Sequence, residues 1–233
     1  MAEIALSESL GKVQARLEHA LDAAGRPAGS ARLLAVSKTK PAAMVRKAHA
    51  LGQRAFGENY LQEALDKQRE LADLDGLEWH FIGPLQSNKT RAVAEHFAWL
   101  HSLERLKIAR RLSEQRPEHL APLNVCLQVN ISREPSKAGV APNEALELAR
   151  EIAALPKLSL RGLMAIPAPA TEFERQREPF AALKALLTEL QAELPEAPLD
   201  TLSMGMSDDL EAAVQEGATI VRLGSAIFGA RTP

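Results

Sequence analysis

The sequence predicts a closed (β/α)8 barrel, the TIM-barrel fold, with one extra N-terminal helix. Eight short apolar runs of strand length recur along the chain, and segments with helical spacing of apolar residues separate them. Strands that alternate with helices and are apolar throughout are typical of parallel sheets covered on both faces, and eight such units favour closure into a barrel. An open doubly wound sheet is the alternative. A dinucleotide-binding version of it is expected to carry a G-x-G-x-x-G motif after the first strand, and none is present there.

The chain opens with an amphipathic helix, since Leu6, Leu10 and Leu17 recur at helical spacing and Gly25 follows as a stop signal. The eight expected strands are 33–37, 54–57, 78–83, 98–103, 124–130, 160–166, 200–205 and 219–224. The clearest helical segments between them are 61–74, 106–112, 146–155 and 180–194. No linker or shift in composition divides the chain, so we expect one domain over residues 1–233.

Composition and charge exclude several classes of protein. A formal net charge of −2 supplies no field that attracts a polyanion, so nucleic acid is not an expected partner. Cys126 is the single cysteine, which rules out a disulfide framework and a cysteine-based zinc cluster and fits a reducing compartment. The N-terminus lacks the pattern of a signal peptide, and no stretch approaches the ~18 apolar residues of a membrane span. We expect a soluble, cytoplasmic protein without a membrane partner.

A lysine follows the first expected strand. The segment SKTKP places Lys38 at the carboxyl mouth of the barrel, where side chains that do chemistry lie in this fold. A partly apolar mouth disfavours the charged ammonium, and a neutral amine condenses with an aldehyde to a Schiff base. A solvated lysine at a strand end is the alternative, and Lys40 is the competing amine.

The last expected strand, in TIVRLGSAIFGAR, predicts an anion site. Gly224 lets the backbone approach an anion closely, and Ser225 follows at the start of a short helix, whose N–H groups and hydroxyl can donate to it. The loop after strand eight is a common phosphate site in such barrels, although a plain helix cap is the alternative. Arg222 lies inside the strand, where a charge is costly unless it is paired, so it is either a ligand-binding residue or half of a structural salt bridge.

Two other strand ends carry polar side chains. In LSMGMSDD we expect Ser203 to assist the anion site and Ser207 to cap the next helix. In FGENYLQEA, Asn59 either donates to a ligand oxygen or caps a helix, and the sequence alone favours the cap. The lysine at the mouth, the anion cradle and the interior arginine together specify a small phosphorylated aldehyde or aldose.

Long segments of the chain resemble the pyridoxal phosphate homeostasis protein family: LLAVSKTKP, FGENYLQEA, WHFIGPLQSNKTR, VNISREPSKAGV and LSMGMSDDLEAAVQEGATIVRLGSAIFGAR. The resemblance covers almost the full length. It implies a monomeric barrel related to the N-terminal domain of alanine racemase, which binds pyridoxal 5′-phosphate (PLP). It further implies that Lys38 forms the Schiff base, that Ser203, Gly224 and Ser225 hold the phosphate, that Arg222 faces the pyridine nitrogen, and that Asn59 lies beside the ring. Members are regarded as regulators of vitamin B6 pools without an established reaction.

The residues agree with a carrier. A protonated arginine can only donate to the pyridine nitrogen, which makes the ring a weaker electron sink. Racemisation also needs a base on each face of the substrate, and Lys38 supplies one. Tyr60 lies at an expected helix start, and His80 and Cys126 are interpreted as core residues. We therefore expect no catalytic residue.

Three hypotheses follow for the function. The first is a protein that buffers PLP and delivers it to apo-enzymes that depend on PLP. The second is a PLP-dependent amino-acid racemase or a related lyase, and the third is a sugar-phosphate aldolase or isomerase. An absorption spectrum of the purified protein separates the third from the others, and turnover separates the first two.

Overall fold

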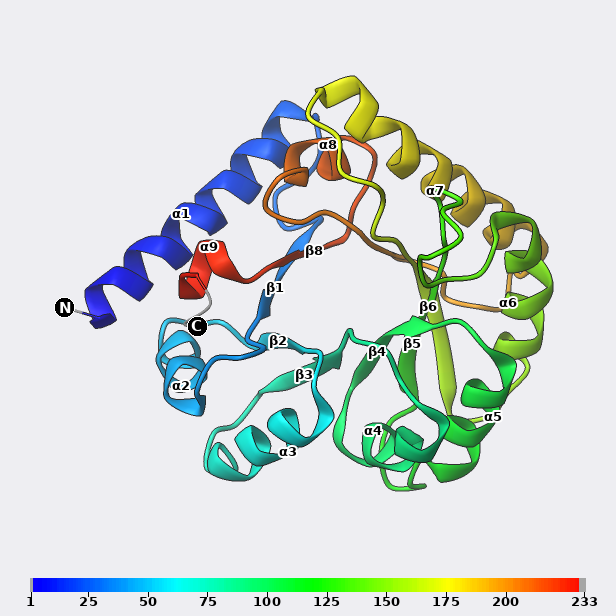
Figure 1. The fold of residues 1–233 in the computed structure, drawn as a ribbon, viewed down its shortest axis with the longest axis horizontal. Helices are drawn as coiled ribbons and strands as arrows, with labels where there is room; N and C mark the ends of the chain where they lie inside the picture. Colours follow the sequence, from blue (N-terminus) through cyan, green and yellow to red (C-terminus); the bar gives the residue numbers. More distant parts are fainter. Residues whose placement is uncertain (1, 231–233) are drawn as a thin grey trace.

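The strands form a closed barrel in chain order, β1-β2-β3-β4-β5-β6-β7-β8, with every neighbouring pair parallel (Figure 1). The computed structural model describes residues 2–230, and the side chains of residues 5–230. The strands are β1 (Arg32–Val36), β2 (Ala55–Glu58), β3 (Glu78–Phe81), β4 (Trp99–Leu103), β5 (Leu123–Gln128), β6 (Leu158–Met164), β7 (Thr201–Ser203) and β8 (Ile220–Leu223). The expected barrel is confirmed, and each strand overlaps the run that predicted it.

Helices surround the barrel. They are α1 (Ala2–Ala23), α2 (Ala42–Ala50), α3 (Leu61–Glu70), α4 (Thr90–His96), α5 (Leu106–Gln115), α6 (Ala145–Ala153), α7 (Phe173–Glu193), α8 (Leu210–Gln215) and α9 (Ser225–Phe228), with short 3-10 turns at Ser87–Lys89 and Pro142–Glu144. Among the described residues no helix is long and apolar enough to cross a membrane.

The apolar pattern of the strands produces two layers of core. The larger buried cluster lies between the strands and the surrounding helices and includes most of the buried leucine, valine and phenylalanine side chains. A smaller cluster takes one residue from each of six strands: Leu34, Ala55, Trp99, Cys126, Met164 and Ile220. Since alternate residues of a barrel strand point inward, this second cluster fills the interior.

The extra N-terminal helix α1 packs on α8 and α9, the helices that flank β8 (Figure 1). The Arg16 guanidinium donates to the carbonyl oxygen of Ser207 at 2.7 Å and forms an ion pair with Glu211 at 2.7 Å. The Ser9 hydroxyl donates to the carbonyl oxygen of Ile227 at 2.6 Å. Helix α1 therefore supports the two loops that follow β7 and β8.

Candidate functional site

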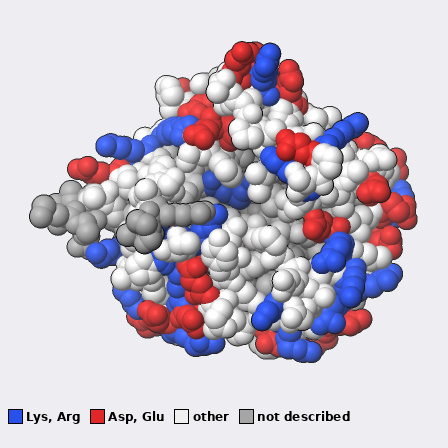
Figure 2. Space-filling view, in the orientation of Figure 1, with Lys and Arg blue, Asp and Glu red and all other residues white. Residues whose placement is uncertain are grey.

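A cavity of about 1060 Å³ opens at the carboxyl ends of the strands. Five of the six residues predicted to bind the cofactor line it: Lys38, Asn59, Arg222, Gly224 and Ser225. Figure 2 shows a hollow near the centre of this view of the molecule, with Lys and Arg atoms in and around it. The fold therefore brings together an amine, an amide, a guanidinium and a glycine-containing loop that are far apart in sequence.

Lys38 lies in the turn after β1, two residues beyond Val36, and is half-buried. The turn places Thr39 in the left-handed region, with φ of 64°, and Lys40 also reaches the cavity. The Lys40 ammonium donates to the carbonyl oxygen of Ala230 at 2.7 Å. The two lysines therefore share a cavity, and the Lys40 ammonium is tied to the backbone of Ala230.

A buried ion network anchors the Lys38 turn to α3. The Lys67 ammonium lies 2.7 Å from Oε1 of Glu58, 2.6 Å from Oε1 of Glu63 and 2.7 Å from the carbonyl oxygen of Ser37. The backbone N–H of Thr39 also donates to Glu63. Burial raises the pKa of Glu58, while Lys67 lowers it. These partners fix the backbone on both sides of Lys38, and the sequence analysis missed them, although a glutamate at the end of a buried strand was a signal.

Asn59 follows β2 and faces the cavity. Helix α3 has Tyr60 at its N-cap position and no side-chain cap, so the helix-capping interpretation of Asn59 is wrong. The Oδ1 atom of Asn59 is buried and has no hydrogen-bond partner among the described residues. Gly83 allows this placement, because a Cβ atom there would lie 2.6 Å from the carbonyl oxygen of Asn59. Asn59 thus offers a buried acceptor to a ligand that supplies a donor.

Arg222 is held inside the barrel by neutral groups. Its side chain donates to Oγ of Ser203 at 2.7 Å and to the carbonyl oxygen of Ala165 at 3.1 Å. Among residues 5–230 no carboxylate forms an ion pair with it, so the structural salt bridge is not found. Burial lowers the pKa of Arg222 to about 10, and the nearby Asp209 opposes this shift. The guanidinium is a buried cation with donors to spare, since it carries five N–H groups.

The loop after β8 forms the wall of the cavity next to Lys38. Gly224 fits against the end of β1, where an added Cβ would lie 3.0 Å from the carbonyl oxygen of Val36. Ser225 begins α9, and the first N–H groups of a helix have no acceptor within the helix. Ser207 also lines the cavity. It was expected to cap α8, but Asp209 occupies the N-cap position.

Ser203 requires a correction. It was expected to help hold the anion, but it does not line the cavity. It is fully buried in the barrel interior, where its hydroxyl contacts Arg222 and Nδ1 of His101, the latter at 2.7 Å. The reason is the inward direction of its side chain on β7. In the segment after β7, Ser207 lines the cavity, four residues further along the chain.

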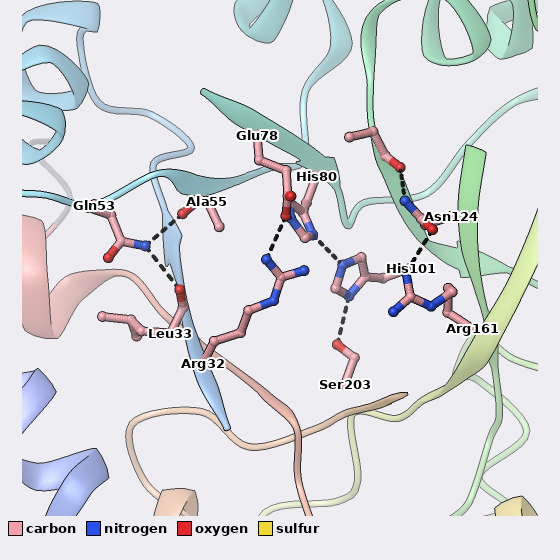
Figure 3. A network of polar contacts seen from close by, with 11 residues as sticks. Arg32, Leu33, Gln53, Ala55, Glu78, His80, His101, Asn124, Arg161 and Ser203 are labelled. Atoms are coloured by element: carbon pink, nitrogen blue, oxygen red, sulfur yellow. Dashed lines mark hydrogen bonds and ion pairs between the residues drawn. The ribbon is translucent and has the colours of Figure 1, made fainter. Parts of the chain in front are cut away.

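A chain of polar contacts leads from Ser203 through the barrel interior (Figure 3). Nε2 of His101 lies 2.8 Å from Nδ1 of His80, and Nε2 of His80 lies 2.6 Å from Oε1 of Glu78. Arg32 pairs with the same Glu78 oxygen at 2.7 Å. Burial lowers the pKa of His80 to about 4 and lowers that of His101 well below its ordinary value. Both histidines are therefore neutral at pH 7.

These neutral histidines predict acid sensitivity. His80 has an ordinary pKa of 6.5 when unfolded and about 4 when folded, so below pH 6.5 the unfolded chain binds a proton that the folded protein excludes. We expect the free energy of unfolding to fall by about 2 kcal/mol between pH 7 and pH 5, with His101 adding to the loss. Denaturant titrations at the two pH values measure it. His80→Phe should show a shallower dependence on pH, and an equal dependence in the variant contradicts this explanation.

The core interpretation of two other side chains agrees with their positions. Cys126 is fully buried, and burial raises the pKa of its thiol to about 12. None of Cys126, His80 and Tyr60 lines the cavity, and Tyr60 is half exposed. No group of three or more His, Cys, Asp or Glu side chains suited to a metal ion is found in the part of the chain that the structure describes.

Sequence reasoning missed several residues of the cavity wall. Lys137 and the helix α7 residues Arg175 and Gln176 line it. Lys137 lies in the loop after β5, and Arg175 and Gln176 follow the Pro-rich loop after β6. Their positions after strand ends were a signal, because the loops at that face of a barrel build the site. Nothing else in these polar segments distinguishes the three residues from ordinary solvent-exposed side chains.

The fold and the site are those of a barrel related to the N-terminal domain of alanine racemase. Residues 9–232 match the family model described as the alanine racemase N-terminal domain. The chain is 63% identical over 226 residues to the pyridoxal phosphate homeostasis protein of Pseudomonas aeruginosa, covering 97% of this chain and 96% of that protein. It is 53% identical over 228 residues to the protein of the same name from Escherichia coli (strain K12), covering 97% of each.

The chain belongs to the pyridoxal phosphate homeostasis protein family. A solved structure of PipY from Synechococcus elongatus, described as having PLP bound, has a TM-score of 0.85 and 40% sequence identity to this chain. The match covers 96% of this chain and all of PipY. The resemblance inferred from the sequence motifs is therefore confirmed.

Proposed function

We propose that this protein binds PLP in the cavity at the carboxyl ends of the strands and holds it reversibly on Lys38. The observation that carries the proposal is the convergence of Lys38, Asn59, Arg222, Gly224 and Ser225 on that one cavity. The PLP bound to the related PipY protein supports the choice of ligand.

The described residues fit the chemical groups of PLP. The buried amide of Asn59, whose Oδ1 has no partner among the described residues, suits a polar group at the edge of the ligand ring. The buried Arg222 guanidinium donates to the ring nitrogen, which has only a lone pair to offer. The backbone around Gly224 and Ser225, with Ser207 opposite, suits the phosphate. Each group of the ligand thereby meets a complementary group of the protein.

The covalent step is a condensation. The neutral Nζ amine of Lys38 adds to the ligand aldehyde, a C=N bond replaces the C=O bond, and the oxygen leaves as water. Hydrolysis reverses the step with the same atoms. The protein is then a reservoir that takes up free PLP and returns it, and we propose delivery to apo-enzymes in the cytoplasm by a single, monomeric chain.

We propose that turnover is inefficient. PLP supplies an electron sink when bound, and a cationic Arg222 at the ring nitrogen weakens it. Racemisation needs a second base opposite Lys38, and none of the candidates weighed from the sequence, Tyr60, His80 and Cys126, lines the cavity. An amino-acid racemase or related lyase remains the competing function.

The decisive experiment is transfer of PLP from the loaded protein to an apo-enzyme in the presence of an enzyme that destroys free PLP. Direct delivery predicts that activation of the apo-enzyme persists with the trap present. Activation that disappears with the trap contradicts direct delivery. Release of racemised amino acid at rates typical of enzymes, about 1 per second or more, contradicts the carrier proposal.

A further inference from the structure

The interior of the barrel contains a continuous hydrogen-bonded chain that ends on Arg222. From the amino end of β3 it runs through Glu78, His80 and His101 to Ser203 (Figure 3). Ser203 in turn contacts the guanidinium of Arg222, and none of these contacts exceeds 2.8 Å. We call these five residues the Glu78–Arg222 relay. His80, His101 and Ser203 are fully buried, so water does not compete for these bonds.

The two charged ends set one direction for every bond in the relay. The side chain of Glu78 is a carboxylate, since its hydrogen bond to His80 lowers its pKa to about 2, so it only accepts and Nε2 of His80 donates. A neutral His80 then accepts at Nδ1, which makes Nε2 of His101 a donor and its Nδ1 an acceptor. The Ser203 hydroxyl must donate to that Nδ1. Its lone pairs are left for Arg222, which only donates.

This direction assigns Ser203 a specific task. A serine hydroxyl can rotate and donate or accept, but here His101 takes its proton and leaves an oxygen that accepts from the guanidinium. Nη1 of Arg222 donates a hydrogen bond to that oxygen, and Nη2 donates to the carbonyl oxygen of Ala165. Without the oxygen, a buried cation retains one of these two acceptors and is free to turn.

We infer that Ser203 and His101 are positioning residues that aim the Arg222 guanidinium at the bound cofactor. The inference rests on the proposed function, because it assigns Arg222 to the cofactor ring. It also gives a role to the buried position of Ser203, whose side chain points into the barrel interior, while Ser207 lines the cavity.

Ser203→Ala tests the inference by removing a single oxygen atom. We expect PLP to bind about tenfold more weakly and the absorption maximum of the bound cofactor to shift, where tenfold corresponds to about 1.4 kcal/mol. In an Arg222→Gln background, Ser203→Ala should change the affinity by less than about twofold, because Ser203 acts through Arg222. A tenfold loss in both backgrounds, or no loss in either, overturns the inference.

Ser113→Ala is the matched control. Ser113 is also buried and its hydroxyl donates to the carbonyl oxygen of Pro156, but it lies on α5, outside the barrel. Ser113→Ala should leave PLP affinity within about twofold of wild type.

A second pair of variants keeps the test decisive if Ser203→Ala does not fold. His101→Asn retains an acceptor near the Nδ1 position and should bind PLP more tightly than His101→Leu, and equal affinities overturn the inference.

Nitrogen NMR of the ligand-free protein separates this inference from the proposed function. Both His80 and His101 should show the neutral tautomer with a proton on Nε2, and a proton on Nδ1 of either overturns the relay. If wild-type protein fails to bind PLP, the proposed function fails while this measurement still decides the relay. If Ser203→Ala binds PLP on Lys38 with unchanged affinity, the positioning role fails and the proposed function stands.

Discussion

Lys38→Ala should abolish covalent binding of PLP and leave the barrel folded. The visible absorption of the loaded protein should disappear, because no other amine is expected to form the C=N bond. The turn around Lys38 is held by the Lys67 network, whose contacts are made by Ser37, Glu58 and Glu63 and the backbone of Thr39. Because Lys67 and Glu63 hold the backbone of this turn, we expect the Lys38→Ala barrel to remain folded. Absorption spectra and thermal unfolding measure the two effects.

Lys40→Ala is the matched control, since Lys40 lines the same cavity but donates to the carbonyl oxygen of Ala230. It should retain the absorption band. Borohydride reduction of the loaded wild-type protein converts the C=N bond to a stable amine, and peptide mapping then identifies the labelled lysine. A label on Lys40 or Lys137, or an unchanged band in Lys38→Ala, removes the central element of the proposed function.

The fold was predictable from the sequence because a parallel barrel imposes a strong pattern. Each strand is buried on both faces and appears as an apolar run, and each helix has the spacing of a half-buried surface. The errors lie at element ends. Strand β1 stops at Val36 and α7 begins at Phe173, seven residues before the expected start at Phe180. Helix α7 contains Pro179 seven residues into its length, and a proline inside a helix normally argues against continuity there.

The residues of the site that directly follow a strand could be predicted from the sequence. Lys38 and Gly224 follow strand ends, and the fold rule for barrels locates such residues at the mouth. Ser203 was expected at the anion site and Ser207 as a helix cap, whereas Ser203 lies in the barrel interior and Ser207 lines the cavity. Which side of β7 faces the interior depends on register in the closed barrel, which the sequence does not show. Long-range partners were also out of reach, since His101 and Ser203 are 102 residues apart in sequence.

The phosphate group is expected to contribute much of the affinity for PLP. Wild-type protein should bind PLP far more tightly than pyridoxal, which lacks the phosphate, because each charge-assisted bond from the backbone near Gly224 contributes roughly 1.5–3 kcal/mol. Gly224→Val places a branched side chain at this wall of the cavity. We expect it to weaken PLP binding by about tenfold to a hundredfold, the equivalent of one or two such bonds, with little change for pyridoxal.

The comparison between the two aldehydes also separates a lost phosphate contact from damage to Lys38. A Cβ at position 224 would lie 3.0 Å from the carbonyl oxygen of Val36, so the added side chain presses on the end of β1, two residues before Lys38. If that pressure displaces Lys38, pyridoxal binding falls in parallel with PLP binding. Gly11→Val is the control, because a Cβ at Gly11 on α1 meets no atom within 4 Å. Equal affinity of wild-type protein for the two aldehydes, measured by titration of the absorption band, places the phosphate elsewhere.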